Sequence, residues 1–108
     1  MISGNFFLDN QISPDEPEKF SEIFNGKIRI EKILSSGHTT EEGKWYDQAE
    51  DEWVVLLSGI AILEFEDNSI LEMKPGDYIF IPAHKKHRVT FTSKEPSCLW
   101  LAIHGNLK

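Results

Sequence analysis

The stretch that decides the fold is Glu52-Trp-Val-Val-Leu-Leu-Ser-Gly59-Ile-Ala-Ile-Leu-Glu-Phe65. Its apolar run over residues 53–57 is typical of a buried strand, and the Ser58-Gly59 pair that follows predicts a turn. Residues 60–66 then predict a returning strand, in which every second side chain is apolar and faces the same side. The stretch therefore predicts two neighbouring antiparallel strands that contribute to one core.

Strand signals continue on both sides, roughly every eight to twelve residues. We expect further strands at residues 27–34, 70–73, 78–81, 87–92 and 98–103. Asp67-Asn68 predicts a hairpin, and Pro75-Gly76 at the centre of Lys74–Asp77 favours a type II turn. This spacing indicates an all-β fold, either an antiparallel sandwich or a barrel. We take the small barrel as the prediction.

One short helix is expected ahead of these strands, over residues 13–24. Ser13-Pro14-Asp15-Glu16 offers an N-cap, a proline in the first turn and a glutamate at the capping-box position. Apolar side chains follow at spacings of three and four over residues 20–24, and Asn25-Gly26 suits a helix end.

The length and composition predict one domain. The chain has 108 residues, 40% of them hydrophobic, and a net charge of −7. We expect residues 1–27 to form an N-terminal strand or helix extension and residues 28–108 to form the barrel. The only cysteine, Cys98, excludes a disulfide framework or a cysteine-based zinc cluster. The negative charge argues against a nucleic-acid partner, because a phosphate backbone would be repelled.

Nothing in the sequence indicates a membrane or an export signal. The N-terminus has no basic segment followed by an apolar stretch, and the apolar region over residues 53–65 is too short and too interrupted to span a bilayer. We therefore predict a cytoplasmic protein without a membrane partner.

Two ionisable residues lie in strands that should face the barrel interior. Glu52 directly precedes the apolar run, and His87 shares a face with Val89 and Phe91. Charged groups are costly in an apolar interior unless something compensates them. A carboxylate and an imidazole that face one cavity would suit a divalent metal ion.

At this point the chain resembles the cupin family. Residues 52–59 resemble the closing half of the first cupin motif, G(X)5HXH(X)3–4E(X)6G, and residues 76–87 resemble the second, G(X)5PXG(X)2H(X)3N. The resemblance covers roughly residues 28–103. It implies a double-stranded β-helix, or jelly-roll barrel, with a metal held by two histidines and the glutamate of the first motif and the histidine of the second.

The metal ligands match this pattern only in part. Glu52 and His87 occupy the glutamate position and the second-motif histidine position. The histidine pair falls on Tyr46 and Gln48, or on residues 45 and 47 with the longer spacing. The remaining candidate ligands are Gln48, Glu52 and His87, with Asp47 as a substitute. Such a mixed set would suit Mn, Fe, Ni or Zn without selecting among them.

Other side chains are candidates for catalysis or for ligand contact. His84 lies in the loop that closes the second motif, where surface exposure and a proton-carrying role at the rim are equally compatible with the sequence. His104 shares parity with Trp100 and would be a general base if it faced inward. The candidate ligand-binding aromatic residues are Tyr46, Trp45 and Phe91.

Two functional hypotheses follow. In the first, the barrel binds a divalent metal and a small polar ligand, and the resemblance implies dioxygenase, isomerase, epimerase or decarboxylase chemistry. In the second, the site is degenerate and the protein is a metal-free binding or sensor module. Cupins of this size commonly form homodimers, and the segment Asn5–Leu8 is expected to add a strand to a neighbour.

Overall fold

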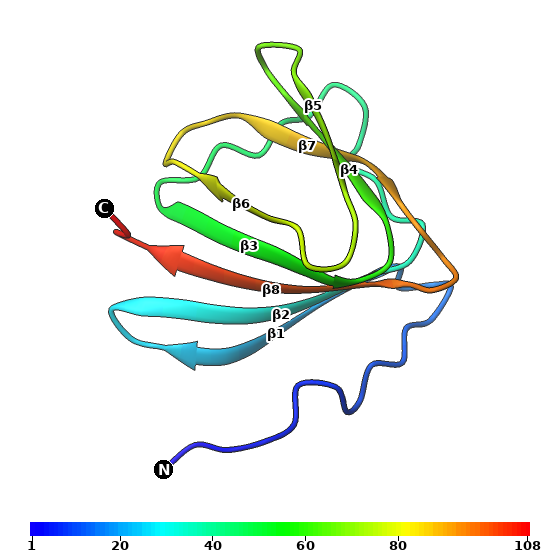
Figure 1. Ribbon diagram of the computed structural model, residues 1–108, viewed down its shortest axis with the longest axis vertical. Coiled ribbons are helices and arrows are strands. Elements are labelled where there is room, and N and C mark those ends of the chain that lie inside the picture. The colour runs from blue at the N-terminus through cyan, green and yellow to red at the C-terminus, as the bar shows by residue number, and fades with distance from the viewer.

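The computed structural model describes all 108 residues as eight strands with no helix (Figure 1). Every strand expected from the sequence is present, within two residues of its expected bounds. The strands are β1 (Glu18–Asn25), β2 (Ile28–Ser35), β3 (Asp51–Ser58), β4 (Ala61–Phe65), β5 (Ile70–Met73), β6 (Tyr78–Ile81), β7 (His87–Thr92) and β8 (Cys98–Gly105).

The strands form two antiparallel sheets that enclose the core. One sheet has the order β1-β2-β8-β3-β6 and the other has the order β5-β4-β7. Figure 1 shows the two sheets facing each other across the interior, with the long β2–β3 connection closing one side. Because β8 pairs with both β2 and β3, the end of the chain joins its first half to its middle. The predicted all-β jelly-roll barrel is confirmed.

The core comes from side chains that alternate along the central strands. Val54 and Leu56 of β3, Leu63 of β4, and Trp100 and Ala102 of β8 are at most 5% exposed. They form one cluster with five further buried residues from β4, β5, β6 and β8. The period of two along β3, β4 and β8 therefore leads directly to one continuous apolar interior.

Glycine is required at the turn between β3 and β4. Gly59 has a φ of 85°, in the left-handed region that side chains disfavour. A Cβ on Gly59 would also lie 2.9 Å from Cys98 Cα, so the turn packs closely against β8. Gly76 meets the expectation for a type II turn, with a φ of 94° in the Lys74–Asp77 segment.

The predicted N-terminal helix over residues 13–24 is wrong, because this segment contains a turn and then strand β1. A helix that began at Ser13 would need the residue 17 N–H to bond the Ser13 carbonyl, but Pro17 has no N–H. The Glu16 N–H bonds that carbonyl instead, at 2.9 Å. The apolar residues of the supposed helical stripe then lie in β1, which pairs with β2 at the edge of the larger sheet.

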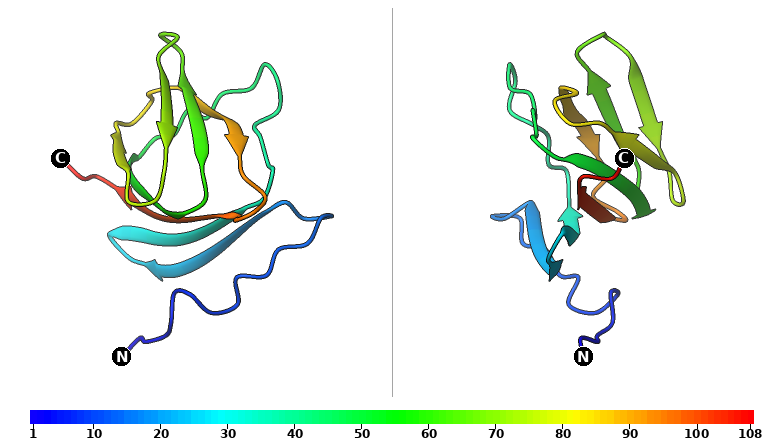
Figure 2. Two further views of the ribbon diagram at one scale, coloured as in Figure 1. Left: turned by 45° about the vertical axis from the view of Figure 1, so that its right-hand side comes forward. Right: turned by 90° about the vertical axis from the view of Figure 1, so that its left-hand side faces the viewer.

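The N-terminal segment covers the outer face of β2. Lys32, only 7% exposed, directs its Nζ to the backbone carbonyl oxygens of Phe6 and Leu8, at 3.4 and 2.9 Å. Figure 2 shows this segment running outside the β1–β2 hairpin. Leu34 is buried beside it on the same outer face of β2. Nothing in the fold could act as a membrane-spanning helix.

Candidate functional site

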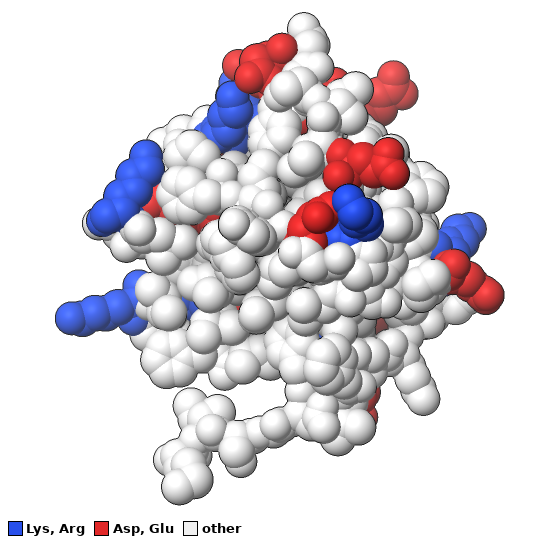
Figure 3. All heavy atoms as spheres, viewed as in Figure 1, with Lys and Arg blue, Asp and Glu red and all other residues white.

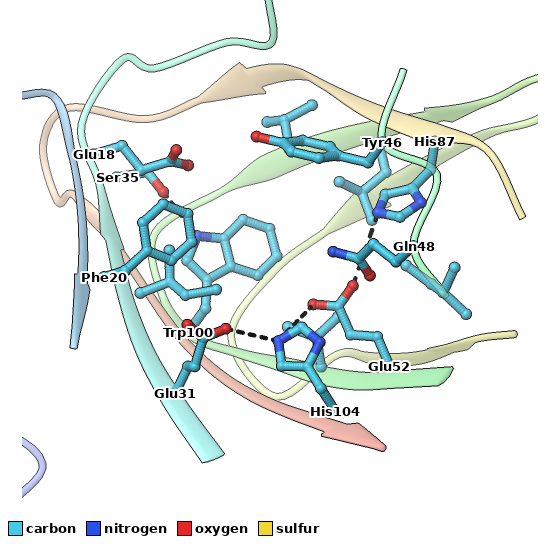
Figure 4. A pocket seen from close by; sticks show the side chains of 15 residues that line it. Glu18, Phe20, Glu31, Ser35, Tyr46, Gln48, Glu52, His87, Trp100 and His104 are labelled. Atoms are coloured by element: carbon cyan, nitrogen blue, oxygen red, sulfur yellow. Dashed lines mark hydrogen bonds and ion pairs between the residues drawn. The ribbon is translucent and has the colours of Figure 1, made fainter. Parts of the chain in front are cut away.

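A pocket opens into the barrel between the two sheets. It has a volume of about 100 Å³ and is lined by fifteen residues from seven strands and from the β2–β3 connection. Eight of these residues are hydrophobic. The polar remainder includes Glu52, His87 and His104, which Figure 4 shows pointing toward one another. An apolar pocket with a few convergent polar groups is the usual form of a small-molecule site.

Glu52 is a buried carboxylate without a hydrogen-bond partner of its own. It is the second residue of β3 and is 7% exposed, and the nearest ring nitrogens lie 3.8 Å from its oxygens. Burial raises the pKa of Glu52 to about 7, and the negative charge of Glu31 raises it further, while Arg29 opposes the shift. A carboxyl group that titrates near neutrality can both accept and donate a proton.

His87 lies on one side of Glu52 with a defined tautomer. Its Nδ1 lies 2.9 Å from the Lys85 carbonyl oxygen, and since a carbonyl only accepts, Nδ1 carries the proton. Its Nε2 then has a free lone pair and lies 3.8 Å from Glu52 Oε1. Burial lowers the pKa of His87, against the effect of the Lys85 carbonyl, so the ring is neutral at neutral pH.

His104 lies on the other side of Glu52 and reaches a second carboxylate. Its Nε2 is 3.8 Å from Glu52 Oε2 and 2.8 Å from Glu31 Oε1. The 2.8 Å contact is close but does not have the alignment of a hydrogen bond, so this buried nitrogen has no well-placed partner. Burial lowers the pKa of His104, while Glu31 opposes that shift.

These four groups form a row rather than a cage. In the order His87, Glu52, His104, Glu31, imidazole and carboxylate alternate across the pocket floor (Figure 4). Glu52 faces one histidine with each of its two oxygens and so lies between the rings. No three His, Cys, Asp or Glu side chains converge closely enough to hold a metal ion. As arranged, the row is suited to proton transfer and hydrogen bonding.

The structure brings some of the sequence candidates into the pocket. Tyr46 and Gln48 line it together with Glu52, His87 and His104. Tyr46 is fixed by two backbone hydrogen bonds with His87, of 2.8 and 3.2 Å. Burial raises the pKa of the Tyr46 phenol, so it remains a hydrogen-bond donor. Gln48 precedes β3 and enters the pocket from the β2–β3 connection.

Other candidates lie outside the pocket. Asp47 and His84 are exposed and pair with each other, with 2.8 Å between Asp47 Oδ1 and His84 Nδ1. The Trp45 ring stacks under the Arg88 guanidinium at 4.5 Å. A bulge in β7 interrupts the alternation after Val89, so Phe91 turns outward and is 45% exposed.

The sequence reasoning missed two pocket carboxylates, Glu18 and Glu31. Ile28 and Ile30 alternate with Glu31 along β2, and this pattern makes the charged face of the strand look external. Glu31, Ile33 and Ser35 of β2 instead line the pocket, while the N-terminal segment covers the other face. His104 could have indicated the inner face of β2. His104 and Trp100 lie at an even spacing on the inner face of β8, and β8 pairs with β2.

Comparison with solved structures finds close relatives of the whole fold. A protein from Ralstonia eutropha JMP134, described as a "putative mannose-6-phosphate isomerase", is 40% identical, with a TM-score of 0.88 over 96% of this chain and 97% of that one. The protein TT1209 from Thermus thermophilus is 16% identical, with a TM-score of 0.79 over 98% of both chains. At such low identity, the second likeness shows the fold alone.

A further structural neighbour contains iron. The Fe(II) form of HppE is 12% identical, with a TM-score of 0.72 over 96% of this chain and 59% of that one, which again shows only the fold. Comparison with curated proteins finds no significant match. The family model for the cupin domain matches residues 33–104, which include every strand from β3 to β7 and most of β8. The chain therefore belongs to the cupin family.

Proposed function

We propose that the protein binds a small polar molecule in the barrel pocket and catalyses a proton-transfer reaction of the isomerase type, with Glu52 as the acid–base group. The observation that carries this proposal is the position of Glu52, buried, without a hydrogen bond, and between two neutral histidines. The relative described as an isomerase, which aligns over nearly its full length, supports the reaction class.

The row of side chains gives each group a separate role. Glu52 takes the proton from the hydroxyl- or amino-bearing carbon of the ligand and returns it to the neighbouring carbonyl carbon. The hydroxyl or amino proton moves to the carbonyl oxygen as the double bond shifts, so that no proton is gained or lost overall. The negative charge of Glu31 repels the ionised form of Glu52 and so favours its protonated form, while His104 lies between these two carboxyl groups. His87 accepts a hydrogen bond through Nε2. Tyr46 and Gln48 position the ligand by hydrogen bonding, and the apolar lining excludes water.

Exchange with solvent tests this proposal without a known product. A panel of small hydroxycarbonyl and aminocarbonyl compounds is incubated with the protein in D₂O, and deuterium incorporation beside the carbonyl is followed by NMR. We expect incorporation with the wild type and its loss in Glu52→Gln. Glu22→Gln, on β1 and outside the pocket, is the matched control and should retain it. Equal incorporation in Glu52→Gln would contradict the assignment of Glu52.

A divalent metal site is the second candidate. The observation that favours it is the tautomer of His87, whose free Nε2 faces the pocket while Nδ1 is anchored by a carbonyl, as in many metal-binding histidines. Gln48, Glu52 and His87 would hold the ion after side-chain rearrangement, and the ion would supply Lewis-acid polarisation of the ligand.

Elemental analysis separates the two candidates. Tag-free protein is measured after reconstitution with Mn, Fe, Ni and Zn, alongside Glu52→Ala and His87→Ala. Near-stoichiometric metal that both variants lose would support the metal site. Absence of bound metal after reconstitution would support the metal-free acid–base site.

A further inference from the structure

The charged side chains of the pocket lining are acidic. Three carboxylate residues, Glu18, Glu31 and Glu52, line it, and its lining contains no lysine or arginine. Glu18 reaches the pocket from β1, Glu31 from β2 and Glu52 from β3, so the three carboxyl groups all come from the larger sheet. An acidic cluster alone indicates little, and the contacts of its members decide what it can bind.

The basic side chains beside these carboxylates lie outside the pocket lining. The Arg29 guanidinium is 2.8 Å from Glu50 and 3.8 Å from Glu31. On the other side, His38 Nε2 lies 3.3 Å from Glu18. Neither Arg29 nor His38 lines the pocket. The pocket therefore presents acceptors to a ligand and no fixed positive charge.

The deepest of these acceptors is unsatisfied. Glu52 is 93% buried, since it is 7% exposed, and it accepts no hydrogen bond from any protein group. Figure 4 shows its carboxylate directed into the pocket between the two imidazoles. A ligand with N–H donors would donate charge-assisted hydrogen bonds to the Glu52 carboxylate, whereas an anion would be repelled by the carboxylates of the pocket.

Aromatic rings line the same space. Phe20, Tyr46 and Trp100 all contribute to the pocket wall. The Trp100 N–H is already used, because it donates to Ser35 Oγ at 3.0 Å, so what Trp100 offers a ligand is its ring. Phe20 is 54% exposed, which places it where the pocket meets the surface. Aromatic faces attract cations, in particular ammonium groups.

We infer that the pocket selects a small organic cation, a primary amine or methylated ammonium, and discriminates against phosphorylated and other anionic ligands. This inference rests on the proposed function and specifies its substrate class. The volume of about 100 Å³ is consistent with it, since an apolar cavity of about 150 Å³ is known to admit benzene, and an amine of four or five heavy atoms is smaller.

A pair of ligands of similar size and opposite charge tests the inference. Binding of ethanolamine, glycolate and inorganic phosphate is measured by Trp fluorescence and by NMR titration, with EDTA present throughout so that metal ions do not contribute. We expect saturable binding of ethanolamine alone. Glu31→Gln should weaken it about tenfold or more, the effect of losing one charge-assisted contact, while Glu22→Gln should not. Glu18→Gln is the second pocket variant, should Glu31→Gln fail to fold.

The possible outcomes separate this inference from the proposed function. Binding of glycolate or phosphate with affinity equal to or above that of ethanolamine would overturn the inference and leave the pocket as a ligand site. Equal ethanolamine binding by the wild type and both pocket variants would also overturn it. Failure of all three ligands to bind would overturn the inference, and deuterium exchange in D₂O would then still test the proposed function separately.

Discussion

Glu52 of β3 lies directly opposite His104 of β8 in an antiparallel pair, and 3.8 Å separates Glu52 Oε2 from His104 Nε2. Side chains that face each other across such a pair share one side of the sheet. The strand register, rather than a flexible loop, therefore places the acid beside the imidazole in the pocket. Because β8 also pairs with β2, where Glu31 lies opposite Ala102, Glu31 is diagonal to His104 and comes within 2.8 Å of it.

The buried carboxylate should reduce stability at neutral and alkaline pH. The pKa of Glu52 is raised from 4.5 to about 7 on folding, so stability falls as the pH rises through this interval, where the unfolded chain loses the proton and the folded chain keeps it. We expect Glu52→Gln to increase the free energy of unfolding at pH 8, on the order of 2 kcal/mol. Most of this gain should disappear at pH 5, because only the first part of the loss of stability between pH 4.5 and 7 has occurred there. Urea denaturation at both pH values measures the difference, and equal gains at pH 5 and pH 8 would contradict this explanation.

Removing the charge of Glu31 should lower the pKa of Glu52. Glu31 is the second cause of the upward shift, after burial. In Glu31→Gln, ionised Glu52 is no longer repelled, so its pKa moves toward the ordinary carboxyl value. Carbon-13 NMR of labelled glutamate side chains follows this titration. Glu72→Gln, on β5 in the other sheet and outside the pocket, is the control, and an equal shift there would show that only the overall net charge matters.

The hydrogen bond that orients Trp100 should contribute to stability. Trp100 Nε1 donates to Ser35 Oγ at 3.0 Å, and both residues are at most 5% exposed. Ser35→Ala leaves the indole N–H without this acceptor and is expected to lower the free energy of unfolding by about 1–2 kcal/mol. Chemical denaturation measures the loss. The neighbouring Ser36→Ala, which removes no side-chain hydrogen bond, should be close to neutral.

The edge of the larger sheet should form a homodimer. β1 pairs only with β2, and Phe20, Ile23 and Phe24 on it are at least 40% exposed. Figure 3 shows that the lower part of this view, beside the N-terminal segment, carries little charge. We expect light scattering after size exclusion to give the mass of a dimer, and Phe24→Glu to give a monomer. A monomeric wild type would contradict the prediction.

The segment Asn5–Leu8 does not form a strand within its own chain. It forms a turn, with the Leu8 N–H on the Asn5 carbonyl at 3.2 Å, and it is held by Lys32. Its expected pairing with a neighbour therefore remains a prediction, separate from that for β1.

The strands could be predicted because apolar side chains alternate along them and turns separate them. The β4–β5 hairpin follows directly from Asp67-Asn68, and the turn at Ser58-Gly59 leads from β3 in one sheet to β4 in the other. The segment that became β1 could not be predicted in this way, because an edge strand leaves its apolar side chains exposed and lacks a clear period of two. The local helix signals therefore led to the wrong prediction, although the proline at residue 17 opposes a helix there.

The site residues could be predicted only where the pattern of apolar residues along a strand already indicated which side chains face inward. Glu52 and His87 were found because they adjoin or belong to apolar strands, and His104 because it continues the parity of Trp100. Glu31 was missed because β2 is covered on both faces, so its outward side also carries apolar residues such as Leu34. Phe91 was placed by strict alternation, which the bulge in β7 interrupts.

The most direct test of the account is the titration of the Glu52 carboxyl carbon by NMR in protein treated with EDTA, assigned with Glu52→Gln. The account predicts a pKa of about 7 that does not change when the chelator is removed and metal ions are added. A pKa near 4.5, or a Glu52 signal that moves with bound metal at one equivalent, would contradict a metal-free acid–base site in this pocket.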